Sequence, residues 1–154
     1  MRRGLALVPL ALVLAGCGAG SGGSGGHSAQ SATASLESAD RTVQSAMTGY
    51  LAGAGGCAKE SSPVVCLEAA DRKLGNSIHS YANLLAVGHG FVVPQADLTT
   101  TRDAAQTLAN SLEILGDAQP TQANYDQVLN TFNVDSAISQ LRADVTTLGG
   151  SLGK

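Results

Sequence analysis

Four successive segments of this 154-residue chain carry apolar side chains at every third or fourth position. That period places the apolar side chains on one face of an α-helix, whereas a half-buried strand alternates at every second position. A single amphipathic helix cannot bury its apolar face, so the four faces must meet in one core. The sequence therefore predicts an all-α fold, an up-down-up-down four-helix bundle formed by residues 36–154. The alternative is a pair of helical hairpins that completes its core only as a dimer.

Composition limits the width of that core. Hydrophobic residues make up 44% of the chain, but aromatic residues make up only 3%, and tryptophan is absent. A core of Ala, Leu and Val lacks the large rings that fill wide spaces, so we expect closely packed helices. The residues expected to face the core are Leu36, Ala39, Val43, Ala46, Tyr50, Leu67, Ala70, Leu74, Ile78, Tyr81, Leu85, Leu98, Thr101, Ala105, Leu108, Leu112, Leu115, Tyr125, Val128, Phe132, Ile138, Leu141, Val145 and Leu148.

Start and stop signals bound the first two helices. The first is expected to begin at Leu36 and to fade at the glycine-rich residues 53–56. In the second, Ser62 is the expected N-cap and Pro63 occupies the first turn, because proline suits the start of a helix. Gly88 is the expected stop of this helix.

The last two helices are expected from 98 to 116 and from 121 onward, after a connection over residues 89–95. Three apolar residues of that connection are expected to fold back onto the end of the bundle, namely Phe91, Val92 and Val93. The apolar pattern of the last helix shifts phase at 133–135, where Asn and Asp favour caps over helix interiors. We expect a kink there, or two abutting helices.

The amino terminus carries three features in a fixed order. Two arginines follow Met1, residues 4–15 form an apolar stretch, and the stretch ends in Leu14-Ala15-Gly16-Cys17. Twelve apolar residues are too few to span a bilayer, which needs about 20 in a helix, but they suit the core of a signal peptide. This arrangement resembles the lipobox of bacterial lipoprotein precursors. The resemblance covers residues 1–17 only and leaves the folded domain unassigned.

The resemblance implies that residues 1–16 are a signal peptide, that Cys17 receives diacylglycerol, and that cleavage occurs before it. Two acyl chains anchor a protein stably, so we expect an extracytoplasmic lipoprotein on the cell membrane. Without the two arginines, seven basic residues remain against twelve acidic ones, a net charge of −5. Residues 17–35 are expected to form a flexible Gly/Ser linker, with a root-mean-square reach of about 23 Å.

Two cysteines remain once Cys17 is assigned to lipid. Cys57 and Cys66 lie on either side of a predicted turn, in a compartment that permits disulfides. We expect a disulfide that closes the tip of a helical hairpin. The alternative is a metal site built from both cysteines with His79 and His89, although zinc ligands usually pair at shorter spacings.

Other ligand candidates are weak. His79 flanks an apolar stripe, where a half-exposed histidine needs no partner. A hairpin places Met47 within about one helical turn of it, a geometry that allows haem ligation by Met and His. Met47 also continues a core stripe, and no C-x-x-C-H motif is present. We therefore expect no cofactor and no metal.

The charged residues offer no reactive cluster. The acidic residues occur singly and are expected on solvated helix faces. No catalytic motif or phosphate loop occurs, and no basic stretch suits nucleic acid, so we expect neither an enzyme nor a nucleic-acid-binding protein. The expected function is a binding module at the cell envelope that contacts another envelope protein. The alternative is a carrier of a small apolar ligand or cofactor in a cleft between helices.

Overall fold

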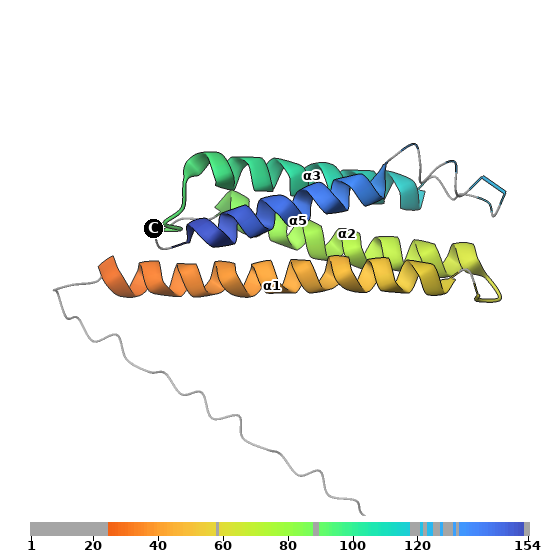
Figure 1. Ribbon diagram of the computed structural model, residues 1–154, viewed down its shortest axis with the longest axis horizontal. Coiled ribbons are helices and arrows are strands. Elements are labelled where there is room, and N and C mark those ends of the chain that lie inside the picture. Colours follow the sequence, from red (N-terminus) through yellow and green to blue (C-terminus); the bar gives the residue numbers. More distant parts are fainter. Residues whose placement is uncertain are drawn as a thin grey trace, which may run out of the picture.

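The computed structural model describes residues 25–57, 59–87, 90–117 and 133–152, with the single residues 121, 123, 124, 127 and 131 between the last two ranges. Its helices run antiparallel to their neighbours along the chain (Figure 1). They are α1 (Gly25–Cys57), α2 (Pro63–Val87), α3 (Gln95–Asp117) and α5 (Val134–Ser151). No strand occurs in the described ranges, so the prediction of an all-α four-helix bundle is confirmed.

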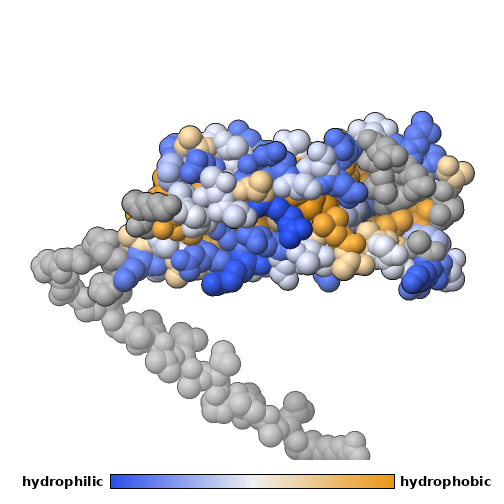
Figure 2. All heavy atoms as spheres, viewed as in Figure 1, coloured by the Kyte–Doolittle hydropathy of each residue, from blue (hydrophilic) through white to orange (hydrophobic). Residues whose placement is uncertain are grey.

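Each helix packs against the next, and the bundle closes between α5 and α1. The packing is most extensive between α2 and α3 and least extensive between α1 and α5. Figure 2 shows the consequence on one face, where hydrophobic atoms are visible between the α5 and α1 surfaces while the outward sides of both helices are hydrophilic or neutral. The α1–α5 interface is therefore the least extensive of the interfaces between consecutive or closing helices in the described part of the chain.

The core consists of the predicted stripes. Among the stripe residues that the structure describes, the large apolar side chains of α3 and α5 are all buried, and those of α1 and α2 are buried except for Leu67, which is half-buried. Met47 is fully buried among them. Tyr125, Val128 and Phe132 lie outside the described residues, so their predicted core positions stay a prediction.

The predicted start of the first helix is wrong. We expected a flexible linker up to residue 35, but α1 begins at Gly25 and residues 25–35 are helical. Ala32 lies against Gly90 in the α2–α3 connection, whose added Cβ would stand 3.9 Å from the Ala32 Cβ. Composition alone favours a coil for a Ser- and Gly-rich segment, because composition carries no information about a tertiary contact such as this one.

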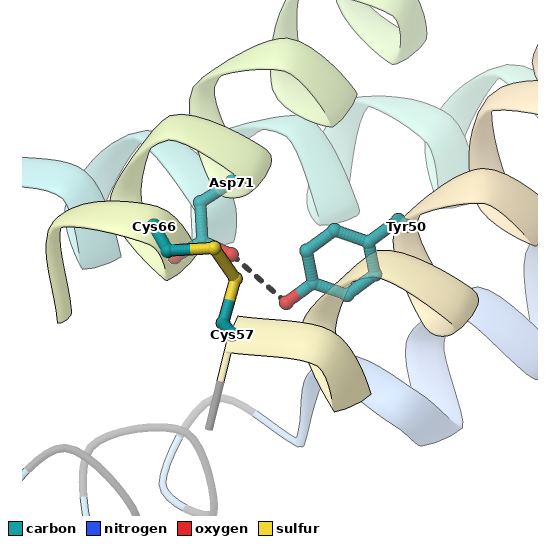
Figure 3. The surroundings of a disulfide bond; sticks show 4 residues. All are labelled: Tyr50, Cys57, Cys66 and Asp71. Atoms are coloured by element: carbon teal, nitrogen blue, oxygen red, sulfur yellow. Dashed lines mark hydrogen bonds between the residues drawn. A yellow bond between two sulfur atoms is a disulfide. The ribbon is translucent and has the colours of Figure 1, made fainter. Parts of the chain in front are cut away.

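The predicted end of the first helix is also wrong. α1 continues through the glycines of 53–56 to Cys57, whose side chain is only 2% exposed. Cys57 forms a disulfide with Cys66 in α2, with their Cα atoms 5.5 Å apart (Figure 3). The disulfide is therefore confirmed, and it joins the last residue of α1 to the first turns of α2. The covalent link holds the glycine-rich end of α1 in place despite its low helix propensity.

The connections follow the sequence signals closely. α2 begins at Pro63 as expected and ends at Val87, one residue before the predicted stop at Gly88. In the connection, Phe91 and Val93 pack against the core, but Val92 is 50% exposed, so its predicted burial is wrong. Consecutive residues of an extended segment point to opposite sides, so all three cannot face inward.

The phase shift at 133–135 marks the start of a helix. Asn133 adopts a left-handed conformation with φ 49°, and α5 begins at the next residue, Val134. Asparagine tolerates this conformation better than most residues. We expected either a kink or two abutting helices here, and the structure has a helix boundary at this point.

Replacing both bridge cysteines, Cys57→Ser with Cys66→Ser, should lower the free energy of unfolding by about 2.5 kcal/mol, because the bridge closes a loop of about ten residues. Urea unfolding followed by far-ultraviolet circular dichroism measures the change. The matched control is Ser61→Ala, which alters the same loop, keeps the bridge and leaves Ser62, the expected N-cap of α2, in place. An unfolding midpoint equal to that of the control would contradict a stabilising role for the disulfide.

Candidate functional site

Two buried tyrosine–aspartate hydrogen bonds join α1 to α2. The Tyr50 hydroxyl in α1 donates to Asp71 Oδ1 in α2 at 2.8 Å (Figure 3). In the opposite sense, the Tyr81 hydroxyl in α2 donates to Asp40 Oδ1 in α1 at 2.6 Å. All four residues are buried, with Asp71 0% and Asp40 6% exposed. Each helix therefore contributes one donor and one acceptor to the same interface.

A repeated sequence explains this reciprocity. Residues 36–50 and 67–81 share the pattern L-E-x-A-D-R followed nine residues later by Tyr, an offset of 31 residues. When two copies of one pattern pack antiparallel, the Asp of each copy meets the Tyr of the other, as across a local two-fold axis. This repeat was not predicted from the sequence, although the ten-residue spacing from Asp to Tyr in both copies is a signal that identifies it.

The expected solvation of the acidic residues is wrong at two positions. Asp40 and Asp71 lie inside the bundle, whereas Glu113 and Asp117 are exposed as expected. A buried carboxyl group requires hydrogen-bond partners, and the tyrosine hydroxyls supply them. Aspartates in the interior were not expected because single acidic residues between apolar positions usually mark the outer face of a helix.

Asp40 is the less well satisfied of the two carboxyl groups. Its Oδ2 atom is buried and accepts no hydrogen bond, and a Cβ added to Gly149 in α5 would stand 3.4 Å from it. Burial raises the pKa of Asp40 above the ordinary value, the hydrogen bond from Tyr81 lowers it, and the negative charge of Glu37 raises it further. Burial and the Asp40 carboxyl raise the pKa of Tyr81 as well.

One candidate binding surface is an open groove of about 350 Å³ between α2 and α3. Its polar lining residues are Asp71, Arg72, Asn76, His79, Glu113 and Asp117. Gly75 lies on the α2 side, where an added Cβ would stand 3.5 Å from the Leu112 Cβ of α3. At Gly75 the groove is lined by backbone alone. The carboxylates of the groove favour a partner that carries positive charge or hydrogen-bond donors.

A second groove of about 390 Å³ lies between α1 and α2 on another side of the hairpin. Serine and threonine hydroxyls dominate its polar lining, at Ser35, Ser38, Thr42, Ser77 and Ser80. The Thr42 hydroxyl donates to the carbonyl of Ser38 at 2.8 Å, and the Ser80 hydroxyl donates to the carbonyl of Asn76 at 2.9 Å. These hydroxyl groups donate to the helix backbone, so the groove offers fewer free hydrogen-bond donors than its number of Ser and Thr residues suggests.

The two weak ligand candidates lie in different environments. Met47 is fully buried in the core, whereas His79 is exposed and lines the α2–α3 groove. The structure therefore does not bring Met47 and His79 into one site for haem. Among the described residues, no group of three His, Cys, Asp or Glu is arranged to hold a metal ion.

Of the remaining predicted residues, Cys57 and Cys66 are joined in the disulfide. Cys17 and His89 lie outside the described residues. No helix in the described part of the chain is long and apolar enough to cross a membrane.

Comparisons with known proteins return no relatives. No protein-family model, no curated protein and no solved structure matches this chain.

The Asp40→Asn variant tests the buried carboxyl group. In the wild-type protein the pKa of Asp40 is raised by folding. The stability that protonated Asp40 contributes is therefore complete below a pH of about 4 and is lost as the pH rises through the raised pKa. The loss is at most about 1.4 kcal/mol per pH unit. The wild-type protein should lose stability over this range, and Asp40→Asn should lose less. Urea unfolding at a series of pH values measures the difference.

Asp103→Asn is the matched control, since this carboxylate is 60% exposed and bound to Arg102 at the surface. Other carboxyl groups titrate in all three proteins, so the comparison between variants isolates Asp40. Equal pH dependence in Asp40→Asn and the wild-type protein would show that Asp40 carries no such linkage.

Proposed function

We propose that this chain is a lipoprotein anchored through Cys17 at the extracytoplasmic face of the cell membrane, with a helical bundle that acts as a binding module at the cell envelope. Two independent features support the location. The amino terminus resembles a lipobox, and the Cys57–Cys66 disulfide suits an oxidising compartment outside the cytoplasm. Neither feature depends on the other, because one lies in residues 1–17 and the other in the bundle.

The early start of α1 shortens the expected distance between the lipid anchor and the bundle. Cys17 lies eight residues before Gly25, so the lipid and the first turn of α1 are separated by at most about 30 Å of fully extended chain. The linker first expected, up to residue 35, would have reached about 60 Å. The bundle is therefore held close to the membrane, where its effective concentration toward other proteins of the same membrane is high.

The observation that carries the binding role is the α2–α3 groove. It combines an opening of about 350 Å³ with the carboxylates of Glu113 and Asp117 and the imidazole of His79. Concave sites with a few converging polar groups are the usual form of binding sites. The lining combines these ionisable groups with apolar surface at Ala109 and Leu112, so it suits a partner that presents basic or polar groups beside an apolar surface.

Mass spectrometry of the native protein tests the anchor. The amino-terminal peptide should begin at Cys17 and carry a diacylglyceryl group, and the protein should partition into detergent. In the Cys17→Ser variant the lipid should be absent and the protein should leave the membrane fraction. A native amino terminus at any other residue would overturn the proposed location.

Site-specific crosslinking in intact cells tests the groove. A photoreactive amino acid at Asn76, which lines the groove, should give a discrete adduct with an envelope component. The matched control is Asn110, an exposed residue of α3 outside both grooves. The same adducts from both positions, or none from Asn76, would contradict a binding role for this groove.

A further inference from the structure

Among the residues that the structure describes, one end of the bundle carries almost no formal charge. The start of α1, the end of α2 and the end of α5 meet there (Figure 1). No Asp, Glu, Lys or Arg occurs in residues 25–36, 74–96 or 145–152. Of the described helices that meet at this end, α3 is the exception, with the half-buried Asp97 in its first turn.

The next charges along α3 neutralise each other. Arg102 donates two hydrogen bonds to Asp103, at 3.0 and 2.8 Å. The opposite end of the bundle is highly charged by comparison. Its charged residues include Lys59, Glu60, Glu68, Glu113, Asp117 and Asp135. Charge is therefore distributed unevenly along the long axis of the bundle.

Apolar side chains are exposed at the uncharged end. Val87, the last residue of α2, is 69% exposed, and Val92 in the following connection is 50% exposed. Their neighbours Phe91 and Val93 pack against the core. The core contacts hold the connection in place, so Val92 is presented outward by a supported backbone.

The anchored residue is attached to this same end. Gly25 begins α1 at the uncharged end, whereas Cys57, the last residue of α1, lies about 48 Å away along the helix. At most about 30 Å of chain separates Cys17 from Gly25, which is too short to bring the opposite end of α1 to the anchor. The position of the anchor and the distribution of charge thus single out the same end of the molecule.

We propose that the uncharged end of the bundle, including Val87 and Val92, docks on the lipid surface in which Cys17 is anchored. This inference rests on the proposed lipidation of Cys17. A protein with a net charge of −5 is repelled by anionic headgroups, and an end with few charges minimises that repulsion while its valines contact the interface. The orientation leaves the disulfide end and much of the α2–α3 groove directed away from the membrane.

The test uses the lipidated full-length protein in vesicles of phosphatidylcholine and phosphatidylglycerol. An environment-sensitive fluorescent amino acid is placed at Val87, at Val92, or at Val65, and quenching by brominated lipid is measured. Val65 is the matched control, because it is 63% exposed and lies about 33 Å from Val87 along α2. Thermal unfolding verifies that each labelled protein is folded.

Quenching at Val87 and Val92 should exceed that at Val65 several-fold. Equal and weak quenching at all three positions, in protein that is lipidated and bound to vesicles, would overturn the docking and leave the proposed function standing. A mass spectrum without lipid on Cys17 would instead overturn the proposed function itself. Shielding of Val92 that depends on protein concentration and persists without vesicles would assign this end to a second copy of the chain and also overturn the docking.

Discussion

The two reciprocal hydrogen bonds between α1 and α2 set the register on which the rest of the bundle depends. If α1 slid by one helical turn, both bonds would break and the two buried carboxyl groups would lose the tyrosine hydroxyls as donors, a cost of about 1–3 kcal/mol for each. The disulfide restrains the same sliding at the end of the hairpin. α3 then packs on α2, and α5 closes the bundle, so the register of the first pair positions every later contact.

The helical stripes could be predicted from the sequence because burial of an apolar face is a periodic property. Leu98 and Leu115 are buried as expected, and so are Ile138 and Leu148. The helix limits of α1 could not be predicted, since they depend on contacts with other parts of the chain. Residues 25–35 and 53–56 have low helix propensity, and a neighbouring loop and a covalent bond support them.

Prediction of the candidate site succeeded only in part. The pairing of Cys57 with Cys66 followed from compartment and spacing, but the interior positions of Asp40 and Asp71 did not follow from periodicity. Polar residues usually mark a surface. Only the repeated ten-residue spacing to a tyrosine indicates that each of these aspartates pairs with a tyrosine of the other helix. The α2–α3 groove was equally hidden, because it arises where residues of two helices come together.

The repeat makes the first helix complementary to itself. α1 carries both Asp40 and Tyr50, so two α1 helices from different chains can form the same pair of bonds that α1 forms with α2. Such pairing between chains would compete with the pairing of α1 and α2 within one chain. The short connection between Cys57 and Pro63 opposes it, because it gives α2 a far higher local concentration near α1 than a neighbouring chain attains. A short turn after α1 therefore favours pairing within one chain over pairing between two chains.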